Sequence, residues 1–222
     1  MTSVNIFNFT AAEYTAASVT LFSFAPSGHT AIPPGQHQPL RIPFRDLQNT
    51  PDLFSFLSWH TQASRFQGRH EELAALHAWA DSDPTVSVKF LVAQGGAGKS
   101  RLAAQFCLER QAMGCEAGFM SLSTPATFPL TYQKPDRGTL IVVDYPEEHR
   151  AVLGDLLGKL AELGLERRIR ILCLSRVEIE RWDDFVAQHR ATDLLDLEPV
   201  SLGELDLADS HAIYHDTQER VA

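Results

Sequence analysis

The fold is decided by the stretch Ala93-Gln94-Gly95-Gly96-Ala97-Gly98-Lys99-Ser100, which joins an apolar segment at 86–92 to a helical pattern that begins at Lys99. Glycines let backbone N–H groups converge on an anion and let the anion approach the chain closely. The following helix directs the positive end of its dipole at the same place. In such a loop Lys99 reaches the β- and γ-phosphates of ATP or GTP, and the Ser100 hydroxyl binds Mg²⁺.

This stretch follows the P-loop pattern of Gly, four residues and then Gly-Lys-Ser/Thr, with one departure. Ala93 stands at the first glycine position, where a methyl group fits if the backbone φ stays negative. The strand before the loop and the helix after it distinguish the stretch from an incidental glycine-rich run. The expected nucleotide contacts in this segment are Gly95, Gly96, Ala97, Gly98, Lys99, Ser100 and Arg101.

Strand and helix patterns alternate from residue 66 onward, which predicts an α/β fold. The strand segments are apolar on both faces, as expected of a mostly parallel sheet covered by helices on two sides. Strands are predicted at 86–92, 117–122, 139–144, 169–174 and 194–197. Helices are predicted at 69–80, 99–113, 148–163, 177–189 and 208–220.

Acidic and basic residues follow two of these strands. Asp144 ends an apolar strand, and ligands of parallel sheets bind at the carboxyl edge, so Asp144 is predicted to lie on the Mg²⁺ side of the phosphates. Glu147 and Glu148 either polarise the attacking water or cap the next helix. Arg176 follows the 169–174 strand and either reaches the γ-phosphate or is an ordinary surface arginine.

Composition restricts the classes of function. The chain has 222 residues, 44% of them hydrophobic, and a net charge of −9. This size suits one α/β domain with an extension, and the acidity disfavours nucleic acid as a partner. The Arg167-Arg168-Ile169-Arg170 run is interpreted as a solvated entrance to a strand.

The cysteine count and the hydropathy indicate a cytoplasmic protein. Three cysteines without a CxxC spacing predict neither a disulfide framework nor a zinc site, and favour a reducing compartment. We find no signal-peptide pattern and no apolar run long enough to cross a membrane, so a membrane partner is not expected.

Residues 1–60 form an N-terminal extension with a different pattern. The segments 4–9 and 18–24 alternate in the manner of β-strands and are predicted to pair as a hairpin. A Pro- and Gly-rich linker follows at 26–43, and 52–59 is predicted to be a short helix. We therefore divide the chain into the extension at 1–60, a P-loop core at 61–205 and the start of a helical lid at 206–222.

Four motifs together resemble one known class. They are Phe-x-Gly-Arg-x-x-Glu-Leu at 66–73, Gly-Gly-Ala-Gly-Lys-Ser-Arg-Leu-Ala at 95–103, Val-Val-Asp-Tyr-Pro-Glu at 142–147 and Leu-Cys-Leu-Ser-Arg at 172–176. Their order and spacing resemble the STAND class of P-loop ATPases, which includes bacterial signalling ATPases and is related to NACHT and NB-ARC modules. The resemblance implies a P-loop NTPase three-layer sandwich with a 51432 strand order, in which the Asp144 and Arg176 strands lie beside the P-loop strand.

The resemblance also implies residue roles. Phe66 and Arg69 would lie near the adenine and the ribose, and Arg176 would sense the γ-phosphate. Lys99 and Ser100 would hold phosphate and Mg²⁺, with Asp144 as the Walker B acid. The Glu147-Glu148 pair would take the place of the acidic pair that follows that acid in NACHT-like segments. The implied catalytic residues are thus Lys99, Asp144, Glu147, Glu148 and Arg176, and the implied metal-site residues are Ser100 and Asp144.

These features predict a nucleotide-dependent signalling switch that binds ATP (or ADP) with Mg²⁺ and hydrolyses ATP slowly. Because the chain stops at Ala222, where a lid would begin, we expect a fragment or a minimal form whose missing or N-terminal regions contact a protein partner or a second copy. A non-catalytic nucleotide-binding or interaction module is the main alternative. A small-molecule kinase would need a basic lid, and a GTPase would need an Asn-Lys-x-Asp motif.

Overall fold

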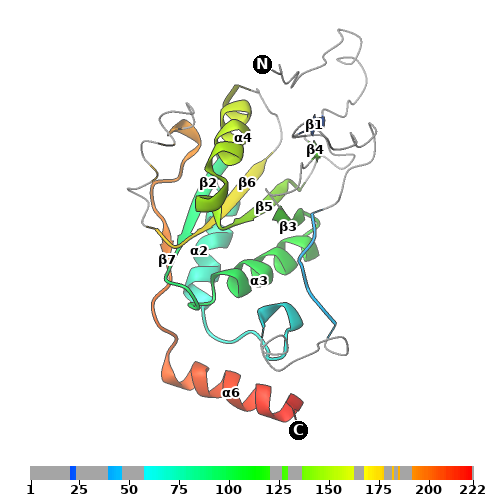
Figure 1. Ribbon diagram of the computed structural model, residues 1–222, viewed down its shortest axis with the longest axis vertical. Coiled ribbons are helices and arrows are strands. Elements are labelled where there is room, and N and C mark those ends of the chain that lie inside the picture. The colour runs from blue at the N-terminus through cyan, green and yellow to red at the C-terminus, as the bar shows by residue number, and fades with distance from the viewer. Residues whose placement is uncertain are drawn as a thin grey trace.

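The computed structural model describes residues 21–23, 40–46, 58–120, 127–129, 137–162, 168–177, 182, 185 and 192–221. Within these ranges the central sheet has five strands, all parallel, in the order β3-β5-β6-β2-β7 (Figure 1). The strands are β2 Val86–Val92, β3 Glu116–Met120, β5 Thr139–Asp144, β6 Ile169–Ser175 and β7 Val200–Ser201.

The predicted strand order is confirmed. Counted along the chain, the five strands of this sheet lie in the order 2-3-4-1-5, which is 51432 from the other edge. One detail of the expectation was wrong, because β6 lies between β2 and β5. Of the Asp144 and Arg176 strands, the one that precedes Arg176 adjoins the P-loop strand, and the strand of Asp144 lies one place further out.

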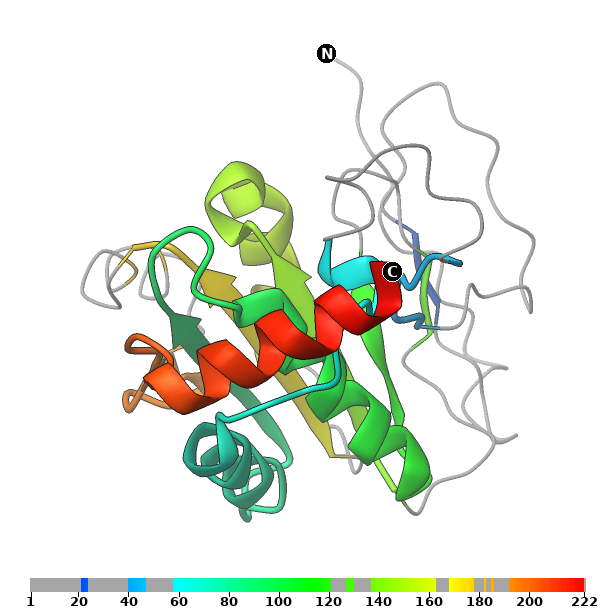
Figure 2. The same cartoon turned by 90° about the horizontal axis from the view of Figure 1, so that it is seen from below.

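Helices cover both faces of this sheet and form the three predicted layers. The α-helices are α2 His70–Ala80, α3 Lys99–Ala112, α4 Arg150–Glu162 and α6 Leu207–Val221. The 3-10 turns are η2 Trp59–Thr61, η3 Pro146–His149 and η5 Thr192–Leu194. Helices α2 and α3 lie on one face and α4 on the other, while α6 crosses one end of the sheet (Figure 2).

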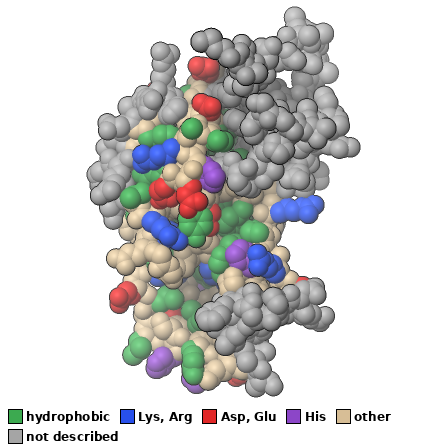
Figure 3. Space-filling model, in the orientation of Figure 1, with side chains coloured by type: hydrophobic (Ala, Val, Ile, Leu, Met, Phe, Trp, Pro, Cys, Tyr) green, Lys and Arg blue, Asp and Glu red, His purple; other side chains and the backbone are tan. Residues whose placement is uncertain are grey.

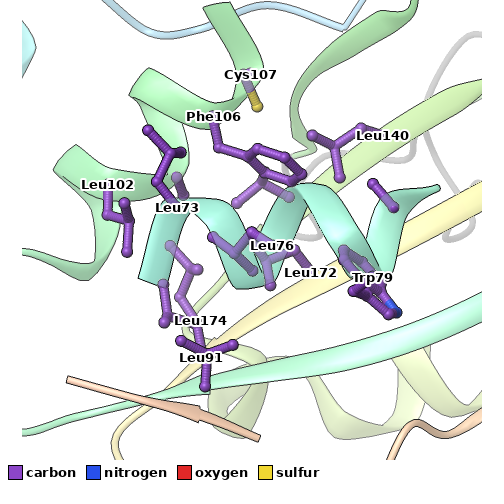
Figure 4. Packing of buried hydrophobic residues seen from close by; sticks show 14 of the residues in the cluster. Leu73, Leu76, Trp79, Leu91, Leu102, Phe106, Cys107, Leu140, Leu172 and Leu174 are labelled. Carbon is purple, nitrogen blue, oxygen red and sulfur yellow. The ribbon is translucent and has the colours of Figure 1, made fainter. Parts of the chain in front are cut away.

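Each face of the sheet has its own apolar core. On the α2/α3 face, Leu76, Trp79 and Phe106 point toward strand residues (Figure 4). On the α4 face, the leucines of α4 pack against β2, β5 and β6. Successive strand side chains point to opposite faces, so a strand buried on both sides reads as a continuous apolar run. β2 and β6 are accordingly buried along their whole lengths.

Arg170 corrects the interpretation of the basic run as a solvated strand entrance. Its side chain is 2% exposed. The guanidinium donates hydrogen bonds to the carbonyls of Trp79, Ser82, Thr85 and Ile169 over 2.7–3.3 Å. The arginine at the start of β6 thus satisfies carbonyl groups at the end of α2, where a positive charge also complements the helix dipole. Burial, with Arg168 and Arg110 nearby, lowers the pKa of Arg170 to about 10.

Two further predicted elements differ from the structure. The last strand is Val200–Ser201 and not 194–197, because Leu194 ends η5 and Leu195 makes only an isolated bridge to Val88. The helix predicted from residue 148 starts as the 3-10 turn η3 and becomes α-helical at Arg150. Most of the helix predicted at 177–189 lies outside the described residues.

Of the described parts of the extension, residues 40–46 contact the central sheet, while residues 21–23 belong to a separate two-stranded sheet. β1 Leu21–Ser23 pairs antiparallel with β4 Thr127–Pro129, and the rest of the predicted hairpin and of the 52–59 helix lies largely outside the described residues. Residues 40–46 lie along the edge strand β3, where Phe119 N–H donates to the Arg41 carbonyl over 2.9 Å. A Cβ at Gly118 would lie less than 3 Å from the backbone of residues 40–41, so this close approach requires glycine.

The surface agrees with the mixed composition. On the face in Figure 3, acidic and basic side chains of the described residues are interspersed. No helix in the described part of the chain is long and apolar enough to cross a bilayer. The three cysteines are unpaired, and Cys107 and Cys173 are buried in the two cores.

Candidate functional site

The glycine loop between β2 and α3 is open on the side where a ligand would lie. Gly96 and Gly98 have φ of 83° and 92°, which glycine adopts without strain. A Cβ built on either residue would meet no atom of the described residues, its chain neighbours aside, within 4 Å. Ala93 is buried and is not among the described residues with positive φ, so its methyl group is accommodated as the sequence analysis required.

Lys99 is held inside this loop. It is 8% exposed, and its Nζ donates to the carbonyls of Ala93 and Gln94 over 2.6 and 3.0 Å. Burial and then the nearby Arg176 lower the pKa of Lys99, while Asp144 and Glu147 oppose that shift. An anion in the loop would favour the charged amine in the same way as those carboxylates do.

Ser100 and Asp144 meet across the sheet edge. Ser100 Oγ donates to Asp144 Oδ2 over 2.8 Å, and Tyr145 N–H donates to Asp144 Oδ1 over 3.1 Å. Burial raises the pKa of Asp144, and the hydrogen bonds and the cations Lys99 and Arg176 partly offset that effect. The two residues predicted to hold Mg²⁺ are therefore adjacent although 44 positions separate them in the chain.

Two adjoining cavities lie beside the loop. The smaller, about 310 Å³, is lined by Lys99 and Arg176, predicted to contact phosphate, and by Ser100 and Asp144, predicted to hold Mg²⁺. The larger, about 490 Å³, extends toward Phe66, Arg69 and α6. Both are lined by Trp59, Gly96, Ala97, Gly98 and Arg101. Together they offer a polar end beside the glycine loop and a roomier end with aromatic and aliphatic walls.

The larger cavity collects the predicted base- and ribose-side residues. Arg69, the residue just before α2, has a left-handed backbone conformation, and its side chain donates to the carbonyls of Ala97 and Gly203 over 3.4 and 2.7 Å. Phe66 lies 5.8 Å below the Arg101 guanidinium and packs against the α2/α3 core. The far wall consists of Leu205 with Ser210, Ile213, Tyr214 and Thr217 of α6.

Arg101 has an unused donor between the cavities. Its Nη2 donates to the Ser64 carbonyl over 3.2 Å, while its buried Nη1 has no hydrogen-bond partner among the described residues. Burial lowers the pKa of Arg101. A buried donor without an acceptor costs free energy, which a phosphate or ribose oxygen would recover.

The two candidate general bases are placed differently. Glu147 Oε1 accepts from Ser175 Oγ and from Arg176 N–H, each over 2.7 Å. Burial alone would raise the pKa of Glu147, but these hydrogen bonds outweigh it and hold that pKa below its ordinary value. Glu148 is exposed, and neither glutamate lines the described cavities. Both lie in the first turn of η3, where negative charge is favoured.

Trp59 is a site residue that sequence reasoning missed. It lines both cavities, and its ring stacks on Phe119 with centroids 5.4 Å apart and on His60 with centroids 4.0 Å apart. The Arg45 N–H, from the segment along β3, donates to the His60 carbonyl over 2.8 Å. Sequence reasoning assigned it no role beyond the end of the predicted 52–59 helix, because long-range contacts place it at the site.

We expect nucleotide to change the fluorescence of Trp59. Trp79 and Trp182 are 5% and 0% exposed and lie in the two cores outside the cavities, so they provide a constant background. A titration of the wild-type chain with ATP and Mg²⁺ should change its emission, and the Trp59→Phe variant should show no such change. Full retention of the change in Trp59→Phe would place the nucleotide elsewhere.

The residues present fit Mg²⁺ brought by a nucleotide rather than a metal bound by protein alone. Among the described residues no three His, Cys, Asp or Glu side chains gather as a metal-binding group. Mg²⁺ keeps several waters and is commonly held by one or two protein oxygens with substrate phosphates. Ser100 Oγ and Asp144, 2.8 Å apart beside the glycine loop, supply such a donor set.

Comparisons with known proteins give a likeness of fold only. No family model and no curated protein sequence matches the chain. Solved structures do match: the Drosophila ORC bound to poly(dA/dT) DNA and Cdc6 has 9% identity over 68% of this chain and 30% of that chain, with a TM-score of 0.46. The Aeropyrum pernix ORC1 protein in complex with DNA has 12% identity over 72% of this chain and 51% of that chain, also with a TM-score of 0.46. The chain thus spans about half or less of the length of either structure, and no residue role is taken from them.

Proposed function

We propose that this chain binds ATP with Mg²⁺, hydrolyses it slowly and acts as a nucleotide-dependent switch of the STAND type. The observation that carries the proposal is the contact between Ser100 Oγ and Asp144 Oδ2 beside the buried Lys99. A hydroxyl, a carboxylate and an ammonium group converge there on an open glycine loop at a helix N-terminus. That combination suits a polyphosphate with its divalent cation better than it suits a lone anion.

Each residue of the site has a separate task in this proposal. Backbone N–H groups of the loop bind phosphate oxygens, and Lys99 exchanges its contacts with the Ala93 and Gln94 carbonyls for the β- and γ-phosphates. Ser100 and Asp144 hold Mg²⁺ and its water shell. When bound, Mg²⁺ neutralises charge that develops on the phosphates. Arg176, which lines the smaller cavity, contacts the γ-phosphate in this proposal.

The switch part of the proposal rests on α6. Ser210, Ile213, Tyr214 and Thr217 of α6 line the larger cavity together with Gly96, Ala97 and Gly98 of the glycine loop. α6 is further joined to the 64–69 segment by a hydrogen bond from Arg65 N–H to Asp216. A ligand that contacts both walls binds the docked position of α6 more tightly than a displaced one, and so shifts its population.

A second candidate function is a nucleotide-binding module without turnover. The observation in its favour is the engagement of Glu147 by Ser175 and Arg176, together with the exposure of Glu148 away from the cavities. A general base must reach the attacking water within hydrogen-bond distance. Ligand-induced rearrangement of η3 would be needed to bring either carboxylate to that position.

Calorimetry and phosphate release together test both candidates. We expect the wild-type chain to bind ATP in the presence of Mg²⁺ and to release phosphate slowly. We expect one of the two variants Glu147→Gln and Glu148→Gln to remove the carboxylate that orients the attacking water. Turnover in that variant should fall by about 100-fold or more while ATP binding persists.

The exposed Asp155→Asn on α4 makes the same chemical change outside both cavities and serves as the matched control. ATP binding with no phosphate release in the wild type would favour the non-catalytic module. No binding of ATP at all would reject both candidates.

A further inference from the structure

Arg176 is joined to Tyr145, a residue to which neither the motifs nor the proposed function assigns a role. Arg176 Nη2 donates to the Tyr145 hydroxyl over 3.2 Å, and the Arg176 Cζ atom lies 4.8 Å from the centroid of the tyrosine ring. The guanidinium therefore makes a hydrogen bond and a cation–π contact with the same side chain. Both residues line the smaller cavity beside the glycine loop.

The backbone holds Tyr145 in an unusual conformation. Its φ and ψ are 53° and 52°, in the left-handed region that a bulky residue rarely occupies. Its N–H donates to Asp144 Oδ1 over 3.1 Å, and the buried Pro146 follows it. Strained backbone of this kind persists where the surroundings over-determine it, and it is found preferentially at functional sites.

The same loop also holds the main chain of Arg176. Glu147, two residues after Tyr145, accepts a hydrogen bond at Oε1 from Arg176 N–H over 2.7 Å. The connection between β5 and α4 thus grips Arg176 at its backbone and at its side-chain end. Without these contacts an exposed arginine would sample many rotamers, and fixing it at the moment of binding would cost conformational entropy.

We propose that Tyr145 is a positioning residue for Arg176 and thereby sets the preference of the site for ATP over ADP. The inference rests on the proposed function, since it assumes that the smaller cavity receives the γ-phosphate. Arg176 then meets that phosphate with its guanidinium already oriented. ADP lacks the γ-phosphate that Arg176 contacts, so the pre-orientation of the guanidinium strengthens ATP binding more than ADP binding.

The test is the ratio of ATP to ADP affinity, measured by calorimetry with Mg²⁺ on folded protein. Arg176→Ala should lower this ratio strongly. Tyr145→Ala removes both contacts but keeps a Cβ at the left-handed position, and should lower the ratio by about 3- to 30-fold. Tyr145→Phe keeps the ring and loses only the hydroxyl, and should lower it by about 2- to 5-fold.

A double variant checks that the two residues act together. Adding Tyr145→Ala to Arg176→Ala should lower the ratio no further, because the tyrosine acts through the arginine. Met113→Ala, at an exposed residue just after α3 and away from both cavities, is the control and should keep the wild-type ratio.

The outcomes separate this inference from the proposed function. If the wild type binds neither nucleotide, the proposed function fails and the inference fails with it. If the wild type prefers ATP, Arg176→Ala removes the preference and neither Tyr145 variant lowers it, the inference alone is overturned. A wild type that binds ATP and ADP equally, or an Arg176→Ala variant that keeps the preference, also overturns the inference alone.

Discussion

Replacing Lys99 by Ala is expected to weaken ATP binding by about 100-fold or more, the cost of truncating one partner of a buried, hydrogen-bonded charge pair. The amine lies in a pocket of its own loop, 2.6 Å from the Ala93 carbonyl oxygen, so a phosphate meets a charge that is already desolvated. Calorimetry with ATP and Mg²⁺ measures the loss directly. Unchanged affinity in Lys99→Ala would sink the assignment of the glycine loop as the nucleotide site.

The control for this experiment is another buried lysine. Lys89 of β2 forms an ion pair with Asp196 at 2.8 Å and donates to the Glu198 carbonyl over 2.6 Å, outside both cavities. Lys89→Met should lower stability by about 1–3 kcal/mol, because it leaves the partly exposed Asp196 carboxylate and the Glu198 carbonyl without this donor. The variant's folded fraction should bind ATP with wild-type affinity. Denaturant unfolding and calorimetry on the same sample separate loss of fold from loss of site.

Replacing Asp144 by Asn is expected to lower both turnover and the gain in ATP affinity that Mg²⁺ brings by about 10- to 100-fold. Substitutions of residues that support a bound metal have effects of this size. The amide keeps an oxygen that accepts from Ser100 and occupies nearly the same volume, so the fold should persist. ATP titrations with Mg²⁺ and with EDTA give the measurement. The gain in affinity on adding Mg²⁺ should be large in the wild type and small in Asp144→Asn. An equal gain in both proteins would exclude Asp144 from the metal site.

The same substitution should not destabilise the nucleotide-free protein. Burial raises the pKa of Asp144, so the folded chain binds its proton more tightly than the unfolded chain does. The ionisation of Asp144 therefore lowers the free energy of unfolding as the pH rises from the unfolded-state pKa through the raised folded-state pKa. Asparagine carries no charge at any pH, so its melting temperature at neutral pH should equal or exceed that of the wild type. A lower melting temperature would indicate that Asp144 stabilises the fold.

The sequence was sufficient to predict most of the fold. Strands such as β2 and β6 are buried on both faces and therefore appear as continuous apolar runs. The strand order was predicted only through the resemblance of four motifs to the STAND class. The last strand was misplaced because Leu194 and Leu195 are apolar, while β7 has only two residues and one of them is exposed.

Prediction was less complete for residues whose role depends on distant contacts. Arg170 was interpreted as solvated because its burial is stabilised by carbonyls of residues 79–85, which no local pattern reveals. Trp59 was missed because its stacking on Phe119, a residue distant in the sequence, and on His60 holds it at the site. Asp144 and Ser100 could be paired in advance because each lies within a recognisable motif. Tyr145 lies inside such a motif, but only its φ of 53° and its contact with Arg176 give it a role.

The segment at 40–46 has a consequence for solubility. An unpaired strand at the margin of a sheet is a template for adding strands of other molecules, and natural proteins blunt such margins. Here β7 is only two residues long at one margin, while Arg41 is bridged to Phe119 of β3 at the other, with Leu40 N–H donating to Glu116 over 3.2 Å. Removing the residues up to 60 would expose the edge of β3 that the 40–46 segment covers, and we expect such a shortened chain to self-associate and precipitate.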